Sequence, residues 1–224
     1  MPRGWVRIPD DAVRQMTEAL IDKQKTSITY DAGFQPGASA RWFQCPYVLV
    51  QAFPYSELGL RRQIKEREFG QVIKALTGMD LGKVLDRGLK DEVRDVVSGA
   101  QVGTVDLDRV NHRFTWAPRL HVAGVGEVRG DVTGYFGRDS LVHVMFYDRS
   151  ENWPLSVDIR SQIRESFRFD PEHVYDKAAG ASGWLSGSKL LRDALVGGVV
   201  GVIVASILGV LRSLRAKRSR TSGP

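Results

Sequence analysis

The stretch GYFGRDSLVHVMFYDRSENWPLSVDIRSQIRESFRFD, residues 134–170, carries the clearest structural pattern in this chain. Its turn signal, Gly-Arg-Asp at 137–139, is followed by a strand, residues 141–147, that is apolar on both faces apart from His143. Pro154 then opens a helix in which apolar side chains recur every four residues. These side chains are Leu155, Ile159, Ile163 and Phe167. We therefore predict a strand hairpin against which this helix packs through a buried stripe.

Upstream of this stretch, helix and strand patterns follow one another. Residues 10–23 place apolar side chains on one face and acids in the first turn, which favours an amphipathic helix. Residues 26–30 alternate as a strand does, and residues 33–39 are rich in turn formers. Residues 42–53 are apolar on both faces, which predicts a central strand whose pairing begins after Pro46.

Two helices and a series of short strands are predicted between these regions. The helical patterns cover residues 56–76 and 81–97. The strand patterns cover residues 102–108, 112–116, 120–123 and 127–136. The last strand has one polar face, which we expect to contact water. Runs of strands separated from runs of helices predict an α+β fold, in which helices cover an antiparallel β-sheet as an α/β/α sandwich. We assign residues 1–25 to an N-terminal helical segment and residues 26–175 to the globular domain.

The hairpin and helix of residues 134–170 resemble the closing elements of the PsbP-like fold. The likeness extends as a pattern over residues 26–170. The resemblance implies an antiparallel sheet between helices. It also implies a binding or assembly role, because members of this family are mostly extrinsic, often lumenal or periplasmic, and are not enzymes. This chain differs in its apolar segment near the C-terminus and in its first residues, where we expect no secretory signal peptide. No functional residue is carried over from the family.

The sequence ALVGGVVGVIVASILGVL, residues 194–211, contains no charged side chain. As a helix it would reach roughly 27 Å at about 1.5 Å per residue, enough to cross the hydrocarbon core of a bilayer. The alternative, a buried core helix, would show a polar stripe, and the only polar side chain here is Ser206. We predict a single transmembrane helix that follows a flexible linker, residues 176–193, and precedes a basic tail, residues 212–224.

Small residues recur at every fourth position along this predicted helix. They are Gly197, Gly201, Ala205 and Gly209. Such a stripe lets two helix backbones approach closely, so it favours self-association or packing on another transmembrane helix. The alternative is that Gly is simply frequent in membrane helices. These four are the only site residues that we predict.

Two considerations give opposite topologies for the predicted anchor. The five basic side chains of residues 212–224 place the C-terminus in the cytoplasm by the positive-inside rule. A segment so close to the end leaves the ribosome only after synthesis stops, as in tail anchors, and the domain then stays where it was made. We favour a cytoplasmic domain on a single-pass C-terminal anchor.

The basic residues of the tail, residues 212–224, supply most of the net charge of +6, and residues 1–187 are neutral in sum. We therefore expect no nucleic-acid partner.

The sequence contains no catalytic, cofactor-binding or metal-binding motif that we recognise. Cys45 is the only cysteine, so no intrachain disulfide can form, and we expect a packed thiol rather than a nucleophile. His112 and His121 flank a predicted hairpin, which leaves a metal site open as an alternative. We expect His143 to be buried and hydrogen-bonded.

The acidic side chains of the predicted sheet favour a solvated face over acid–base chemistry. They are Asp106, Asp108, Glu127 and Asp131. The glycines Gly124, Gly126 and Gly130 miss the spacing of a dinucleotide site.

Two functions are compatible with these patterns. We favour a membrane-anchored, non-enzymatic interaction or assembly module, without a cofactor and with a protein partner. An exposed aromatic patch around Trp42, Phe43 and Trp153 would support it, although large aromatic side chains usually lie in the core. The alternative is a membrane-tethered small-ligand-binding domain or hydrolase with an unrecognised site, which would need convergent polar groups in an apolar setting.

Overall fold

The computed structural model describes most of the first 177 residues, namely 1–21, 29–37, 41–57, 63–78, 80, 82–83, 89–94 and 96–177. The predicted membrane helix, its stripe of small residues and the basic tail lie outside these residues. In the part of the chain that is described, no helix is long and apolar enough to span a membrane.

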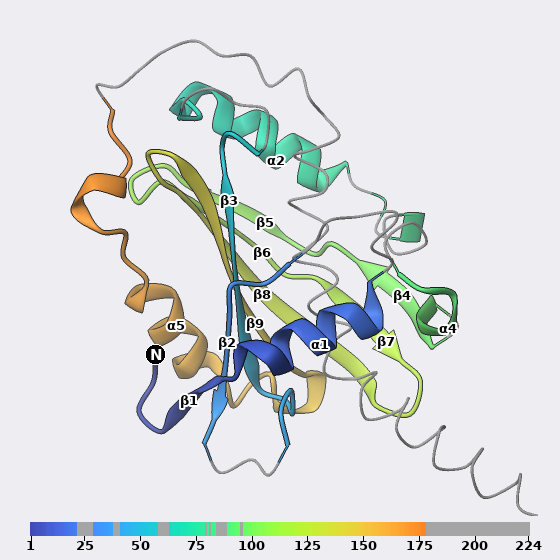
Figure 1. The fold of residues 1–224 in the computed structure, drawn as a ribbon. Helices are drawn as coiled ribbons and strands as arrows, with labels where there is room; N and C mark the ends of the chain where they lie inside the picture. The colour runs from blue at the N-terminus through green and yellow to red at the C-terminus, as the bar shows by residue number, and fades with distance from the viewer. Residues whose placement is uncertain are drawn as a thin grey trace, which may run out of the picture.

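Within the described residues, one nine-stranded antiparallel sheet runs through the middle of the domain (Figure 1). Its strands are β1 (Trp5–Ile8), β2 (Ala32–Pro36), β3 (Tyr47–Pro54), β4 (Val97–Gln101), β5 (Val105–Asp108), β6 (Arg113–Trp116), β7 (Arg119–Val122), β8 (Gly126–Phe136) and β9 (Ser140–Arg149). The order along the sheet is β1-β2-β3-β9-β8-β6-β5, while β7 pairs with β8 and with β4. The two longest strands, β8 and β9, pair along most of their length and form its centre.

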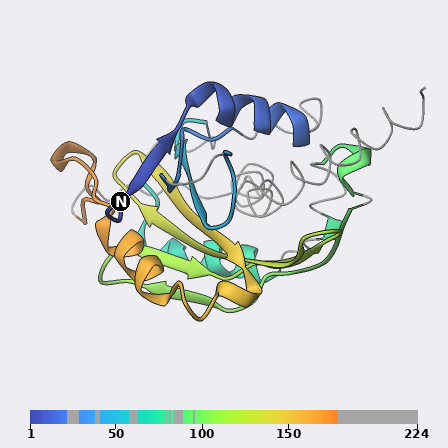
Figure 2. The same ribbon diagram turned by 90° about the horizontal axis from the view of Figure 1, so that it is seen from below.

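Helices lie on both sides of this sheet. They are α1 (Asp10–Leu20), α2 (Phe69–Thr77), α4 (Asp91–Arg94) and α5 (Val157–Ser166), with 3₁₀ turns η1 (Glu66–Glu68), η2 (Ser150–Asn152) and η3 (Pro171–His173). Figure 2 shows α1 and α5 on opposite sides of the sheet. Helices therefore cover both faces of the sheet, and both faces bury apolar side chains.

Two apolar cores result. The larger core lies between the sheet and the helices α1 and α2, where the Phe69 ring of α2 stacks on Phe136 of β8 at a centroid distance of 3.9 Å. The smaller core lies under α5 and joins Ile163 to Val144 and Phe146 of β9. Because both cores use β9, this strand is buried on both faces, which confirms the prediction for residues 141–147.

The first strands differ from the predicted ones. No pattern indicates β1, which is short and mostly exposed but pairs with β2. Strand β2 lies where turns were expected, in residues 33–39, and the strand predicted at 26–30 falls largely outside the described residues. Strand β3 begins at Tyr47, directly after Pro46, as predicted.

The helix predicted over residues 81–97 is confirmed in part, because α4 lies within this range, but the range also contains a β-bridge before α4 and the first residue of a strand. Leu89 forms an isolated β-bridge with Ile21, and β4 already begins at Val97. Because β4 pairs with β7, interstrand hydrogen bonds override the local helical pattern. In its described part, the helix predicted over residues 56–76 is helical only from Glu66, as η1 and α2, and residues 56–57 and 63–65 are not helical.

The polar face of β8 contacts water along only part of its length, whereas we expected the whole face to be exposed. Thr133 and Tyr135 are buried because α5 covers them, and the Tyr135 hydroxyl donates to the Arg164 carbonyl oxygen. Leu155 does not belong to the buried stripe, since α5 begins only at Val157 and Leu155 is 82% exposed.

Candidate functional site

The candidate site lies on the sheet face that looks toward α1 and α2. Strand register places Gln51 of β3 opposite His143 of β9, His143 opposite Gly134 of β8, and Gly134 opposite Phe114 of β6. Directly paired residues in a sheet point to the same face. Trp116 follows Phe114 on that face, because alternate residues of a strand share a side. We call Gln51, Trp116 and His143 the interior polar set.

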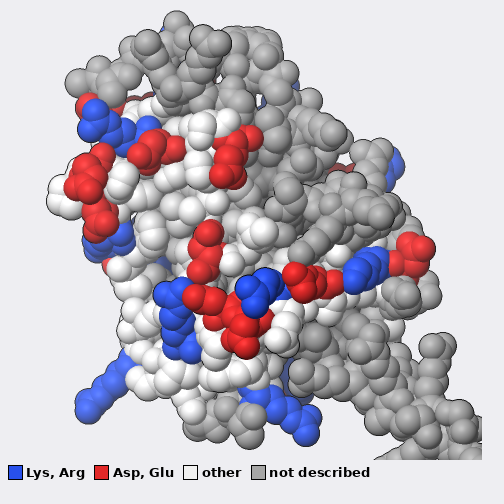
Figure 3. Space-filling view, in the orientation of Figure 1, with Lys and Arg blue, Asp and Glu red and all other residues white. Residues whose placement is uncertain are grey.

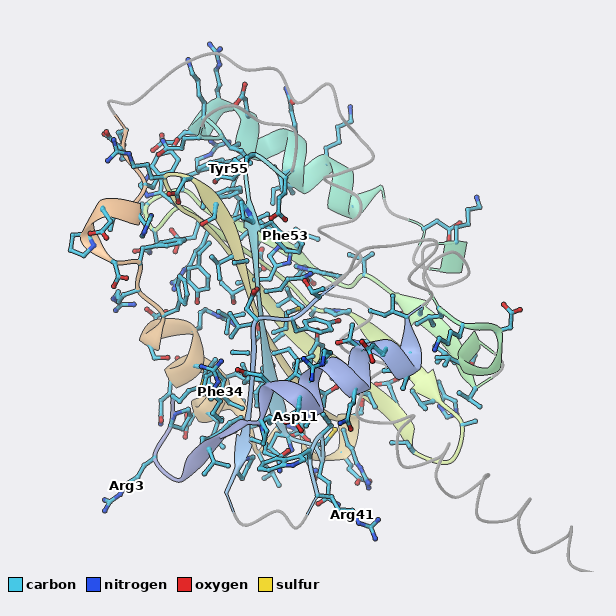
Figure 4. All side chains as sticks on the ribbon, in the orientation of Figure 1. Arg3, Asp11, Phe34, Arg41, Phe53 and Tyr55 are labelled. Carbon is cyan, nitrogen blue, oxygen red and sulfur yellow. The ribbon has the colours of Figure 1, made fainter. Side chains whose placement is uncertain are left out.

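Glycine at position 134 makes room for an aromatic wall around this set. A Cβ atom at Gly134 would meet its three nearest neighbours, all ring atoms of Phe114, at 2.9 Å or less. The Phe114 ring therefore lies directly over the backbone of β8 and reaches His143 edge-on, with ring centroids 5.8 Å apart. From β3, Phe53 contacts the same imidazole edge-on at 5.1 Å (labelled in Figure 4).

Four buried polar atoms of the interior polar set have no hydrogen-bond partner among the described residues. These atoms are Gln51 Oε1, Trp116 Nε1, and both ring nitrogens of His143, and the three residues are 3%, 2% and 0% exposed. Burial lowers the pKa of His143 to about 3, so the ring is neutral at neutral pH. The prediction that His143 is buried is confirmed, and the prediction that it is hydrogen-bonded is wrong.

The chemistry of this arrangement suits binding better than catalysis. A neutral imidazole offers one N–H donor and one acceptor nitrogen, Gln51 Oε1 accepts, and Trp116 Nε1 donates. No charged group belongs to the set. Its hydrogen-bonding atoms face an apolar core, where an uncompensated charge would be strongly disfavoured.

The single cysteine lies apart from this set and packs against the larger core. Burial raises the pKa of the Cys45 thiol to about 12, and nearby Asp148 adds to the shift. The thiol is therefore protonated at neutral pH and a weak nucleophile, which agrees with a packed side chain.

The two histidines considered for a metal do not approach each other. His121 of β7 pairs with Glu127, near the start of β8. His112 is next to Arg113, which pairs with Tyr135 near the other end of β8. His112 Nε2 instead lies 2.9 Å from Glu66 Oε1. In the described part of the chain, no group of three or more His, Cys, Asp or Glu side chains could hold a metal ion.

Two of the four carboxylates predicted to form a solvated face, Asp131 and Asp108, belong to ion-pair networks that reach α5, whereas Asp106 and Glu127 are exposed. Asp131 Oδ2 lies 2.7 Å from Arg164 Nη2. Arg113 of β6 bridges Asp108 of β5, at 3.1 Å, and Glu165 of α5, at 2.9 Å. The expectation of a solvated face is therefore wrong for Asp131, which is largely covered.

Gly124 and Gly126 belong to the β7–β8 hairpin and have φ values of +79° and +101°. Gly130 is opposed by Pro118 and Tyr147, because a Cβ there would meet their side chains at 2.8 and 3.0 Å. These glycines therefore serve turn geometry and close packing of the sheet.

The aromatic residues Trp42, Phe43 and Trp153 do not form one exposed patch. Trp42 is exposed, Phe43 is buried in the larger core, and the Arg160 guanidinium covers Trp153 at 3.9 Å from the ring centroid. Other apolar side chains stay partly exposed at the margin of the smaller core. They include Trp5, Phe34 and Val50.

Charged side chains of both signs are interspersed on the face shown in Figure 3. On α1 and the preceding strand, Arg7 Nη2 pairs with Asp10 Oδ1 at 2.9 Å, and both side chains are exposed.

The segment after α5 is fastened to the domain. The Tyr175 ring stacks on His112 at a centroid distance of 4.2 Å. The backbone of Asp176 exchanges two hydrogen bonds with the Gln63 side chain, at 2.8 and 2.9 Å. These contacts hold the chain in place as far as Asp176, the first residue of the predicted linker.

No protein family and no curated protein matches this chain. Its structure is similar to the solution structure of cyanobacterial PsbP (CyanoP) from Synechocystis sp. PCC 6803. The match has a TM-score of 0.44 and 11% sequence identity, and it covers 76% of this chain and 84% of that chain. This likeness concerns the fold alone and agrees with the weak PsbP-like resemblance of residues 134–170.

Proposed function

We propose that this chain is a membrane-anchored, non-enzymatic binding module. A single C-terminal helix, residues 194–211, would hold it in the bilayer, with the folded domain in the cytoplasm. Protein partners would be contacted by the domain and by the small-residue stripe of the helix.

The observation that carries this proposal is the fastened C-terminal segment. Contacts such as the paired hydrogen bonds between Asp176 and Gln63 fix the chain to the domain as far as the first residue of the predicted linker. From residue 177 to residue 193 an extended chain spans at most about 60 Å. A helix at residues 194–211 would therefore keep the domain close to the membrane surface, which suits a tethered module.

The separation of the reactive groups supports a role without catalysis. The Cys45 thiol is protonated, because burial raises its pKa to about 12. The neutral His143 ring contacts Phe53 and Phe114 rather than a nucleophile. Asp131 is engaged by Arg164. None of these contacts joins a nucleophile to a base.

Membrane extraction of the full chain tests the anchor. Ile203→Arg places a charge at the middle of the predicted helix, where an arginine disfavours insertion by about 2.5–3.5 kcal/mol. We expect the wild type to resist extraction by alkaline carbonate and the variant to be released. Ser219→Arg adds the same charge to the basic tail and is expected to stay with the membrane. Release of the wild type under the same conditions would contradict the proposal.

A further inference from the structure

Two segments of the chain meet at the end of the sheet where β3 begins, namely residues 1–5 and residues 36–46. Because β1 pairs antiparallel with β2, the residues that precede β1 lie beside those that follow β2. The only charged side chains in the two segments are Arg3 and Arg41. Both are exposed, and Figure 4 shows them projecting from the same end of the domain. We call these two segments the arginine end.

The arginine end also presents a tryptophan on a fixed backbone. Trp42 is 41% exposed. The backbone on both sides of it is held by the buried Gln35 side chain, which donates to the Arg41 carbonyl oxygen at 2.9 Å and accepts from the Phe43 N–H at 2.7 Å. Phe43 is buried and has a φ of +62°, which is uncommon for an aromatic residue. A large apolar ring that is held outward in this way suits contact with another surface.

The charges around Trp42 indicate what kind of surface it meets. At the lower margin of Figure 3, the described charged side chains on the face in view are basic. At the opposite end of the sheet, carboxylates such as the exposed Asp139 accompany the basic side chains, and an anionic surface would repel them. An indole beside arginines matches the headgroup region of a bilayer, where tryptophan is enriched and basic side chains are attracted to anionic lipids.

We propose that the arginine end docks on an anionic lipid surface, with the Trp42 ring among the headgroups and the two arginines on their anionic groups. This inference rests on the proposed function, because the anchor keeps the domain close to the bilayer. The predicted linker leaves the other end of the sheet, where Lys177 pairs with Glu66. Its reach of about 60 Å exceeds the length of the longest strand, β8, which is about 37 Å, so the linker can pass beside the domain.

Docking can be measured on the full chain by fluorine NMR. The protein is labelled with fluorotryptophan and reconstituted in nanodiscs that contain a gadolinium-chelating lipid, and Trp42→Phe identifies the Trp42 signal. In nanodiscs of phosphatidylcholine with phosphatidylserine, we expect the Trp42 signal to broaden much more than that of the buried Trp116. In phosphatidylcholine alone, or at high salt, the broadening should decrease because the attraction of the arginines to the surface is absent or screened.

Substitution of the arginines tests the electrostatic part of the proposal. Arg3→Gln and Arg41→Gln should each lower the ratio of docked to undocked domain about fivefold in the nanodiscs that contain phosphatidylserine. Arg138→Gln removes an exposed arginine from the turn between β8 and β9, at the opposite end of the sheet. It is the matched control and should leave the ratio unchanged.

The proposal is overturned if Trp42 broadens no more than Trp116 in the presence of phosphatidylserine, which would leave a protein partner as the occupant of the arginine end. Equal broadening in the two lipid compositions, or wild-type broadening in both arginine variants, also overturns it. In each of these cases the anchor stands, because the chain still elutes with the nanodiscs. Elution of the wild type apart from phosphatidylcholine nanodiscs would instead contradict the anchor, and this inference with it.

Discussion

Gly134→Ala tests the packing that shapes the candidate site. Gly134 lies on β8, and a Cβ added there meets three Phe114 ring atoms at 2.9 Å or less. Distances below 3.0 Å require one partner to move. Phe114 is completely buried, so its ring cannot swing toward solvent. The methyl group therefore displaces either the ring or the backbone of a central strand.

Overpacking of this kind destabilises a core by about 1–3 kcal/mol. For a domain of this size, each kcal/mol lowers the melting temperature by about 2–4 °C. We expect Gly134→Ala to lower it by about 2–12 °C in thermal unfolding of the reconstituted full chain. The double variant Gly134→Ala/Phe114→Leu removes the ring and is expected to lose less stability than the two single changes predict together.

Gly70→Ala in α2 is the matched control. A Cβ there meets nothing within 4 Å, and alanine in a helix is favoured over glycine by up to about 1 kcal/mol. Its melting temperature should be unchanged or slightly raised. If Gly134→Ala is as stable as Gly70→Ala, the Phe114 ring is not held over β8 and the described site geometry is wrong.

Three further changes test separate parts of the structure. Asp131→Asn removes the charge that pairs with Arg164 and should destabilise the domain by about 1–3 kcal/mol in urea unfolding, whereas Asp10→Asn at an exposed pair should change stability by less than about 1 kcal/mol. The pKa of His143 is lowered to about 3 in the folded state, so its contribution to stability should be complete above its unfolded pKa of about 6.5 and should fall as the pH decreases towards 3. In a pH series of urea unfolding, His143→Phe should therefore lose less stability at low pH than the wild type. An equal loss of stability in the two proteins would refute the assignment. Gly201→Leu should weaken self-association of the full chain in crosslinking assays by interrupting the small-residue stripe, while Val200→Leu should not, and equal crosslinking of both would argue against the stripe.

The central hairpin and last helix were predictable because their patterns are local. The strand of residues 141–147 is apolar on both faces, so both faces had to be covered by other parts of the chain, and β9 is buried on both faces in this way. The helix after Pro154 was recognised from its four-residue spacing, but its start was placed too early. Leu155 fits the spacing, yet it precedes α5 and remains exposed.

Elements that depend on distant partners were not predictable from local patterns. Strand β1 is stabilised by pairing with β2, and its four residues alternate too briefly to signal a strand. Strand β4 was not predicted, because residues 98–101 follow the predicted helix of residues 81–97 without a strand pattern, and its pairing with β7 is visible only in the fold.

The candidate site was missed for the same reason, although a signal was present. Gln51 interrupts the apolar face formed by Tyr47, Leu49 and Phe53, and His143 interrupts the corresponding face of β9. Only the register between the two strands shows that these exceptions lie opposite each other. A single polar residue on an otherwise apolar strand face therefore indicates one residue of the site, but it does not show which residue of another strand lies opposite.

Protease accessibility is the most direct test of a domain tethered on the cytoplasmic side. The full chain carries one tag at each terminus, and intact cells are compared with sealed, inverted membrane vesicles. We expect the N-terminal tag to be protected in intact cells and removed in inverted vesicles, with the C-terminal tag showing the opposite behaviour. Removal of the N-terminal tag from intact cells, with protection in inverted vesicles, would contradict the proposed topology. Protection of both tags in intact cells, together with absence of the chain from the washed vesicles, would contradict the anchor itself.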